Sequence, residues 1–269
     1  MKTALVTGAA RGIGRATVDG LVDRGWRVVA GVRDPSTAPF DQPDVKVVHL
    51  DVTDAACVRQ GVAAAQVFAG GALDAVVSNA GYALLGAVED VAMDEVHAVF
   101  ATNTFGALAV VQAALPAMRE AGGGTVVFVS TIGASLPTPL LGVYRASKAA
   151  LNALADVLAL EGRPFGIRVG RVEPGMVATE FSKATRRSGS ITDPDGPYAP
   201  LGAALFQGMG RWREHYESTA DQVAAEIIRI LEDPNSEQIT LVGDDAKELQ
   251  GSTEDEMIAF LGVDWPRRS

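Results

Sequence analysis

Residues 4–14 read ALVTGAARGIG, a short apolar run followed by a glycine-rich turn. The apolar run predicts a buried strand, and the pattern that follows predicts a helix to about Asp23. Glycines at such a junction allow a tight turn and a close approach of the backbone N–H groups to a phosphate, which the helix N-terminus also attracts. The spacing of Gly8, Gly12 and Gly14 is not the usual Gly-x-Gly-x-x-Gly fingerprint. The stretch therefore predicts a phosphate-binding loop of a variant kind, directly after the first strand.

The rest of the chain repeats this strand-then-helix pattern. Further strands are predicted at 27–32, 45–50, 73–78, 124–129, 167–172 and 238–242. Helices are predicted at roughly 54–69, capped by Thr53 or Asp54, at 93–121 and at 144–161. A further helix, capped by Thr219, is predicted to run to about Leu231. Alternation of this kind predicts an α/β fold, a Rossmann-type doubly wound parallel sheet of about seven strands with helices on both faces. We expect residues 1–269 to form a single dinucleotide-binding catalytic domain.

Two segments fall outside the alternating pattern. Residues 176–218 are expected to form a substrate lid of short helices over an apolar ligand, or simply to pack on the domain surface. The apolar side chains of this segment are Phe181, Leu201, Leu205, Phe206, Met209 and Trp212. Residues 243–269 are expected to form a C-terminal extension, with a helix-start signature at 252–256.

Composition narrows the function classes. The 269 residues carry a net charge of −10 and a pI near 4.8, which argues against nucleic acid or an anionic membrane surface as a partner. The single cysteine, Cys57, permits no disulfide within the chain and fits a reducing compartment. The first residues suggest no signal peptide, and we find no uninterrupted apolar run long enough for a membrane span. These features together lead us to expect a cytoplasmic protein. The histidines show no metal-ligand spacing, so we expect no metal site.

The end of the second strand bears on the choice of nucleotide. Many NAD enzymes place an acidic side chain there to bind the ribose 2′-hydroxyl. Here the position is Val32, followed by Arg33, and Arg11 lies in the glycine loop. Two guanidinium groups suit a 2′-phosphate and favour NADP(H) over NAD(H). Asp34 leaves an alternative open, because its carboxylate either faces the ribose or is a solvated loop charge.

Candidate catalytic residues lie later in the chain. Tyr144 and Lys148 are four residues apart on a predicted helix and therefore share a face. An ammonium near a phenol lowers the pKa of that phenol and makes it a usable proton donor or acceptor. Chance spacing on a solvated helix face is the alternative. Asn103, which is unfavourable inside a helix, either faces water or has a task.

The ordered motifs resemble those of the short-chain dehydrogenase/reductase family over nearly the whole chain. They are Thr7-Gly8-x-x-x-Gly12-x-Gly14, Asp51-Val52, Asn79-Ala80-Gly81, Asn103, Ser130-Thr131, Tyr144-x-x-x-Lys148 and Pro174-Gly175-x-x-x-Thr179. Each motif is weak alone, and the ordered set is highly specific.

The resemblance implies a role for each matching position. The backbone from Gly8 to Gly14, including Ile13, would bind the pyrophosphate and adenine ribose, and Asp51 and Val52 would contact the adenine. Asn79 would support the central strand, with Ala80 and Gly81 near the cofactor. Tyr144 would be the general acid in reduction, Lys148 would lower its pKa and bind the nicotinamide ribose, and Asn103 would hold a water linking Lys148 to solvent. The nicotinamide carboxamide would be held by Pro174, Gly175, Val177 and Thr179.

The chain departs from the family at the serine that usually binds the substrate carbonyl, thirteen residues before the tyrosine. Thr131 occupies that position and offers an equivalent hydroxyl. Ser130 is the substitute if the strand end is shifted by one residue. Glu173 also stands where many members have asparagine, and nothing follows from that difference.

The resemblance implies an oxidoreductase that transfers hydride between NADP(H) and a small-molecule carbonyl or secondary alcohol. The run from Glu173 to Phe181 and the tail are similar to the branch with 17β-hydroxysteroid and retinol dehydrogenases, which suggests a lipophilic substrate. A homodimer or homotetramer is implied, often formed through the helices that carry Asn103 and Tyr144. The alternatives are a non-catalytic NADP(H)-binding sensor or scaffold, and, less favoured, an epimerase or dehydratase.

Overall fold

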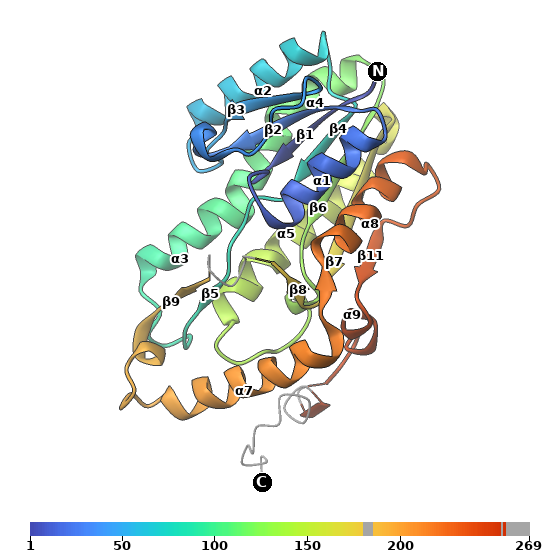
Figure 1. Cartoon of the computed structure of the whole chain (residues 1–269). Helices are drawn as coiled ribbons and strands as arrows, with labels where there is room; N and C mark the ends of the chain where they lie inside the picture. The colour runs from blue at the N-terminus through green and yellow to red at the C-terminus, as the bar shows by residue number, and fades with distance from the viewer. Residues whose placement is uncertain (180–184, 254, 257–269) are drawn as a thin grey trace.

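A seven-stranded parallel sheet forms the centre of the computed structural model, which describes residues 1–179, 185–253 and 255–256 (Figure 1). The strands are β1 (Thr3–Thr7), β2 (Arg27–Val32), β3 (Val45–His49), β4 (Ala75–Ser78), β6 (Gly124–Val129), β7 (Ile167–Pro174) and β11 (Ile239–Val242). Their spatial order is β11-β7-β6-β4-β1-β2-β3. The chain places β2 and β3 on one side of β1 and then crosses back to place β4 on the other. This topology confirms the predicted Rossmann-type doubly wound fold.

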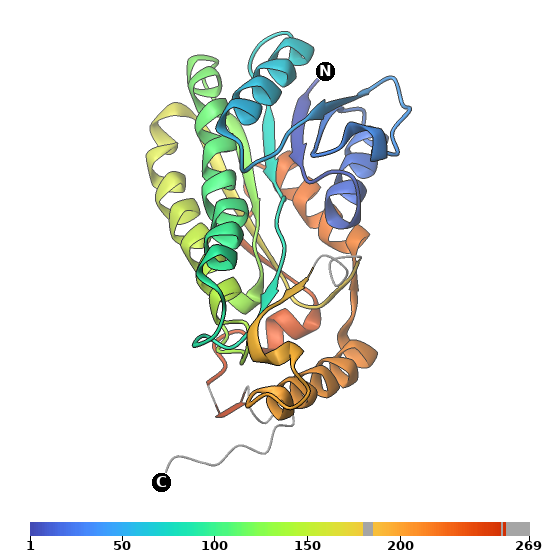
Figure 2. The ribbon, with the colours of Figure 1, turned by 90° about the vertical axis from the view of Figure 1, so that its left-hand side faces the viewer.

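Helices cover both faces of the sheet, as Figure 2 shows with the sheet nearly edge-on. One layer contains α2 (Ala55–Ala69), α4 (Ala107–Glu120) and α5 (Gly142–Glu161), and the other contains α1 (Gly12–Asp23) and α8 (Ala220–Glu232). Side chains along a strand alternate between the layers. Leu5 packs into the cluster with α2, α4 and α5, whereas Ala4 and Val6 pack into the cluster with α1 and α8. The strands therefore read as continuous apolar runs, because both faces are buried.

The predicted helix at 93–121 is continuous but not regular. It consists of α3 (Met93–Phe100), a π-helical turn η2 (Ala101–Gly106) and α4. The turn brings Gly106 so close to Val52 that an added Cβ would lie 2.7 Å from the Val52 carbonyl oxygen. By length and composition this 28-residue helix is apolar enough to cross a membrane. That is weak evidence for a span, because α4 packs its apolar side chains into the core of the sheet.

The expectation of short helices in residues 176–218 is wrong for the described part. One 18-residue helix, α7 (Ala199–Tyr216), spans the base of the molecule in Figure 1. Leu205 is fully buried, and Leu201 before it and Met209 and Trp212 after it lie at helical spacing on the same apolar cluster, which favours a helix. Before it come β8 (Val177–Ala178), β9 (Arg186–Arg187) and a 3₁₀ turn, η5 (Gly189–Thr192). Phe181 lies outside the described residues.

Short pairings tie this segment to the rest of the chain. β9 pairs with β5 (Leu84–Leu85), and β8 pairs with β10 (Ser218–Thr219). Further short elements are η1 (Pro35–Thr37), η3 (Ile132–Ala134), η4 (Arg163–Phe165) and α9 (Asp244–Glu248).

The predicted helix starts are present where the structure describes them. Asp54 caps α2, and Thr219 caps α8 in a capping box with Gln222. In the tail, Thr253 and Glu256 exchange hydrogen bonds between backbone N–H groups and side chains.

Candidate functional site

A cleft of about 1330 Å³ lies beyond the carboxyl ends of the strands. A typical pocket for one small molecule holds roughly 300–1,000 Å³, so this cleft has room for a dinucleotide and a second small molecule. Its lining contains every predicted site residue except Gly14 and Asn103. The lining residues among them are Gly8, Arg11, Gly12, Ile13, Arg33, Asp51, Val52, Asn79, Ala80, Gly81, Ser130, Thr131, Tyr144, Lys148, Pro174, Gly175, Val177 and Thr179.

The glycine loop has the backbone geometry that its residues predict. Gly8 and Gly12 have φ of +64° and +54°, which other residues rarely adopt. Gly14 lies against Gly8, because an added Cβ would contact the Gly8 carbonyl oxygen and the Asn79 amide. Arg11 precedes α1 and gives it no side-chain cap. The first N–H groups of α1 are therefore left for an anion.

Asn79 holds the glycine loop against the end of β4. Its amide Nδ2 donates to the carbonyl oxygens of Thr7 (2.9 Å) and Gly8 (3.3 Å). The Thr7 hydroxyl accepts in return from the backbone N–H groups of Asn79 (3.0 Å) and Ala80 (3.1 Å). These hydrogen bonds join the two loops into one wall of the cleft.

The ends of β2 and β3 hold the charged groups predicted for the nucleotide. Arg11 and Arg33 are both exposed on the lining. Asp34 accepts from the Ser36 hydroxyl (2.6 Å) and backbone N–H (3.0 Å), and these bonds lower its pKa. Burial tends to raise the pKa of Asp51, but hydrogen bonds from Thr53 and the nearby Arg33 charge outweigh it, and the pKa is lowered. Both carboxylates are thus ionised beside the arginines.

Thr131 and Tyr144 lie together at the inner end of the cleft. The Thr131 hydroxyl hydrogen-bonds the Tyr144 phenol, which favours the phenolate, and also contacts the Pro174 carbonyl oxygen at 3.3 Å. Ser130 lies on the opposite side of the backbone, because successive side chains alternate. Its hydroxyl donates to Asn152 Oδ1 at 2.5 Å. Of the two predicted hydroxyls, the structure brings only that of Thr131 to Tyr144.

Lys148 and Asn103 lie next to this pair. Lys148 is 4% exposed and its Nζ donates to the Val129 carbonyl oxygen at 2.8 Å. Burial lowers its pKa to about 8. Asn103 is fully buried and binds both the N–H and the C=O of Tyr82 at 3.0 Å. Gly81 passes so close that an added Cβ would lie 3.0 Å from Asn103 Oδ1 and 3.4 Å from Lys148 Nζ.

The pKa of Tyr144 departs from the sequence-based expectation. We expected Lys148 to lower it, but in this structure the pKa is raised well above its usual value. Burial at the inner end of the cleft disfavours the phenolate, and the hydrogen bond from Thr131 offsets this only in part. The Lys148 ammonium is held by Val129 rather than by the phenol. The prediction of a lowered pKa is therefore wrong here.

The loop after β7 is fixed by contacts that the sequence did not reveal. The Gly175 N–H donates to the Val242 carbonyl oxygen (2.9 Å), and the Met176 carbonyl oxygen accepts from the Ser218 N–H (3.0 Å). The Met176 N–H donates to Asp245 Oδ2 at 2.6 Å. Asp245 is fully buried, and burial raises its pKa. A carboxylate from the C-terminal extension thus holds the loop that carries Val177 and Thr179.

A buried polar network lies behind the ends of β6 and β7. Arg171 Nε donates to Glu173 Oε1 at 2.6 Å, and both side chains are nearly fully buried. Asn152 Nδ2 donates to the same oxygen at 3.0 Å and links the pair to Ser130. Arg171 also pairs with the half-exposed Asp156. The network anchors the residues next to Thr131 and Pro174.

Sequence reasoning placed Met209 and Trp212 over an apolar ligand but missed the rest of the outer wall of the cleft. Here the lining residues are Tyr82, Leu85, Leu136, Leu141, Arg186, Met209, Trp212 and Arg213. They come from the loop after β4, from β5, from the segment before α5, from β9 and from α7. The apolar residues of the predicted lid were a partial signal, but the pairing of β5 with β9 had none.

The residues of the cleft fit a nicotinamide dinucleotide. The uncapped N-terminus of α1 and the exposed Arg11 and Arg33 offer donors and charge for phosphates. Within the described part of the chain, no group of three His, Cys, Asp or Glu side chains is placed to hold a metal ion.

Known proteins resemble the chain in sequence and in structure. A sequence model of the short chain dehydrogenase family matches residues 2–189. The 3-ketodihydrosphingosine reductase of Bacteroides thetaiotaomicron is 36% identical over 196 residues, which cover 72% of this chain and 71% of that protein. A crystal structure of a short-chain dehydrogenase from Streptomyces avermitilis has a TM-score of 0.81 at 30% identity, covering 97% of this chain and 94% of that one. A short chain dehydrogenase from Burkholderia cenocepacia in complex with NADP has a TM-score of 0.76 at 25% identity, covering 99% and 100%.

The matched sequence spans the glycine loop, the Tyr144 helix and the loop after β7, and the matched structures span nearly the whole fold. The chain therefore belongs to the short-chain dehydrogenase/reductase family of oxidoreductases.

Proposed function

We propose that the chain is an NADP(H)-dependent oxidoreductase that interconverts a carbonyl compound and an alcohol, with Tyr144 as the general acid and base. The observation that carries the proposal is the Thr131–Tyr144 hydrogen bond at the inner end of the cleft, with Lys148 one helical turn away. A hydroxyl donor and a proton donor at one point suit an oxygen atom on which negative charge develops.

The direction of the Tyr144 pKa suits reduction at neutral pH. Because the pKa is raised, the phenol is protonated and available as a donor. A bound reduced nicotinamide would supply the hydride for the carbonyl carbon. Tyr144 would give its proton to the carbonyl oxygen, so that the carbonyl compound becomes an alcohol. Thr131 donates a hydrogen bond to the same oxygen. Oxidation needs the phenolate and is expected to accelerate as the pH rises.

Replacement of Tyr144 tests this role. Tyr144→Phe should lower kcat at least about 100-fold, since general acid catalysis contributes roughly that much or more. Its affinity for NADPH, followed by cofactor fluorescence, should stay unchanged. Tyr198→Phe, a phenol away from the cleft lining, is the control. Undiminished turnover in Tyr144→Phe would overturn the role, and tight NADPH binding without turnover across a broad panel of ketones and aldehydes would favour a sensor or scaffold.

The preference for NADP(H) is supported by charge at the end of β2. Arg33 follows the buried Val32, and Arg11 is exposed on the same lining, while Asp34 is turned to Ser36. A structural relative has also been solved with NADP. We expect kcat/KM to be higher with NADPH than with NADH and the preference to fall in Arg33→Ala. Equal or better use of NADH by the wild-type protein would refute it.

A lipophilic substrate is supported by the outer wall of the cleft, which is rich in Leu, Met and Trp side chains. The sphingoid relative acts on a lipid ketone by its name, which agrees with this class. A matched series of ketones with lengthening alkyl chains should show kcat/KM rising with chain length. A flat series would argue against the proposal.

We also propose a homo-oligomer. Phe105, Val157 and Leu160 are large apolar side chains on the helices of Asn103 and Tyr144, and all are more than half exposed. Light scattering after size exclusion should give a multiple of 28.0 kDa, and a monomer would exclude it.

A further inference from the structure

The outer half of the cleft has an uneven charge. Its described lining is mostly apolar and carries two cations, Arg186 and Arg213. The carboxylates among the described lining residues are Asp34 and Asp51, and Asp51 lies near Arg33, whose charge also acts on Tyr82. This arrangement contrasts with a chain whose net charge is −10. A positively charged outer wall in an acidic protein indicates that this part of the cleft attracts an anionic ligand.

A backbone hydrogen bond and an aromatic ring, rather than a carboxylate, hold Arg186 in place. Its backbone N–H donates to the Ala83 carbonyl oxygen at 2.9 Å as part of the β5–β9 pair. Its guanidinium lies over the Tyr82 ring, with Cζ 4.8 Å from the ring centroid. In the part of the chain that the structure describes, Arg186 forms no ion pair with a carboxylate. The ring contact orients the guanidinium and leaves its N–H groups for another partner.

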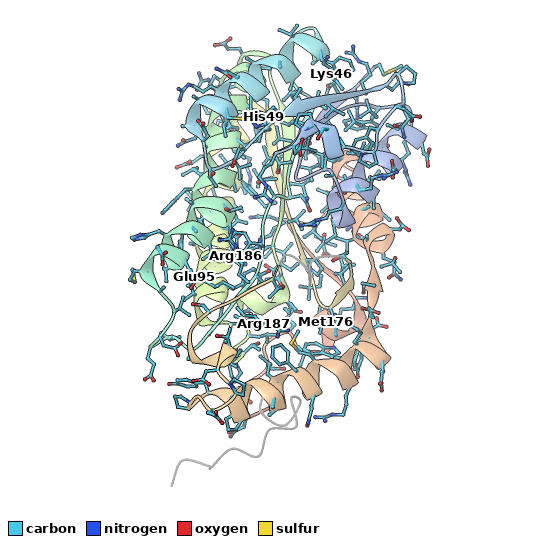
Figure 3. The ribbon with its side chains drawn as sticks, turned by 60° about the vertical axis from the view of Figure 1, so that its left-hand side comes forward. Lys46, His49, Glu95, Met176, Arg186 and Arg187 are labelled. Atoms are coloured by element: carbon cyan, nitrogen blue, oxygen red, sulfur yellow. The ribbon has the colours of Figure 1, made fainter. Side chains whose placement is uncertain are left out.

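An acid in the neighbourhood of Arg186 already has a hydrogen-bond partner. Figure 3 shows Glu95, on α3, labelled next to Arg186, and the charges of both residues, together with that of Arg33, affect the pKa of Tyr82. The Glu95 carboxylate accepts a hydrogen bond from the Ser188 hydroxyl. Arg213 differs from Arg186, because it pairs with Glu217 on α7 at 3.1 Å. Of the two cations, Arg186 is therefore the one available to a ligand.

The position of Arg186 links it to the reaction centre. Tyr82, which supports the guanidinium, is bound through its backbone to Asn103 beside Lys148. Apolar side chains, including Leu85, Met209 and Trp212, line the same outer half of the cleft. A ligand with an apolar middle would therefore carry its anionic group to Arg186 while its carbonyl lies at Tyr144.

We propose that Arg186 binds the carboxylate or phosphate of an amphipathic substrate, so that the preferred substrates are lipophilic carbonyl compounds with an anionic group remote from the carbonyl. This inference rests on the proposed carbonyl-reducing function for the location of the carbonyl. Arginine suits this task because its planar fork binds such oxyanions in a bidentate way. The other source of the same chemistry is a phosphate of the cofactor, and the test separates the two.

The chain provides a matched control in the next residue. Arg187 lies on the other side of β9, with its guanidinium 4.5 Å from the Phe206 ring on α7, and it is absent from the cleft lining. Figure 3 shows the two arginines at different levels, with Arg187 closer to α7. Arg186→Gln and Arg187→Gln remove the same charge from the same short strand.

The test uses aliphatic keto acids with different spacings between ketone and carboxylate, each beside its methyl ester. Calorimetry with NADP⁺ bound measures affinity without turnover, and kcat/KM with NADPH measures reduction. The best acid should exceed its ester by roughly 10- to 100-fold in the wild-type protein, the range of a hydrogen bond to a charged group. Arg186→Gln should lose this preference with little change for the ester, whereas Arg187→Gln should keep it.

Three outcomes would overturn or redirect the inference. Equal affinity for acid and ester in the wild-type protein would refute it. A preference that survives in Arg186→Gln would refute the assignment to that residue. A fall in NADPH affinity of Arg186→Gln, with acid and ester reduced equally, would assign the residue to a cofactor phosphate instead. Failure of the proposed function is distinct, because it would appear as acid binding with NADP⁺ but no reduction of any ketone.

Discussion

Replacing Glu173 with leucine should destabilise the protein strongly, because it breaks an ion pair inside the core. Side-chain exposure is 8% for Arg171 and 5% for Glu173, and their Nε–Oε1 distance is 2.6 Å. Glu173→Leu leaves the guanidinium buried with Asp156 as its remaining acid. Asp156 has a side chain that is 49% exposed, so water screens its charge and it compensates little.

The magnitude follows from this geometry. Breaking a buried pair by removing one partner costs about 3–5 kcal/mol. We expect about 3 kcal/mol, at the lower end of that range, because Asp156 and the Asn152 carbonyl oxygen still accept from Arg171. For a chain of this size that corresponds to a fall in Tm of roughly 6–12 °C.

Urea unfolding at one fixed protein concentration measures this loss, since association with other subunits would shift apparent stability. The double variant Arg171→Met/Glu173→Leu removes both charges and should lie within about 1 kcal/mol of the wild-type protein. Asp156→Ala, which removes the exposed partner, should cost under about 1 kcal/mol. The reasoning fails if Glu173→Leu costs less than about 1 kcal/mol, or if the double variant is as unstable as the single one.

Further outcomes follow from the site. Because burial lowers the pKa of Lys148 to about 8 from 10.5, the folded chain binds fewer protons between these values than the unfolded chain does. In the absence of cofactor, wild-type stability should therefore rise with pH across that window relative to Lys148→Met, and parallel urea-derived curves would contradict this. Gly175→Ala forces a Cβ into the Asp245 carboxylate and should cost about 1–3 kcal/mol in thermal unfolding and weaken NADPH binding. Gly210→Ala, a helical site with open space around it, should stabilise by roughly 0.5–1 kcal/mol, and similar effects at both glycines would disprove the packing argument. Thr131→Val should lower kcat at least about 100-fold while Thr131→Ser retains most of it, and equal kinetics for the two variants would exclude a hydrogen bond from this hydroxyl.

Local signals sufficed for the layers of the fold. β2 and β6 match their predicted ranges, 27–32 and 124–129, because strands buried on both faces read as uninterrupted apolar runs. The caps at Asp54 and Thr219 were also readable, since each depends on a side chain and a backbone only two or three residues away. The cleft followed from the fold, because strand ends that are distant in sequence meet at one edge of a parallel sheet.

Features that depend on distant packing were not readable. The length of α7 is set by an apolar cluster that joins Leu205 to Leu136 and Leu249. The raised pKa of Tyr144 comes from its depth in the cleft, and spacing in the sequence carries no information on depth. Nothing in the sequence marks Asp245 as the partner of the Met176 N–H, because the two residues are 69 positions apart.

The contact between Asp245 and Met176 bears on how the chain acquires its site during synthesis. The glycine loop and the strands around β1 come from the first third of the chain, so this half can assemble early. The loop after β7 gains its anchors only when β11 and Asp245, which lie later in the chain, have been synthesised. A nascent chain that has not reached residue 245 would present the phosphate-binding half of the cleft beside an unanchored opposite wall. Both walls of the cleft are therefore in place only late in the synthesis of the chain.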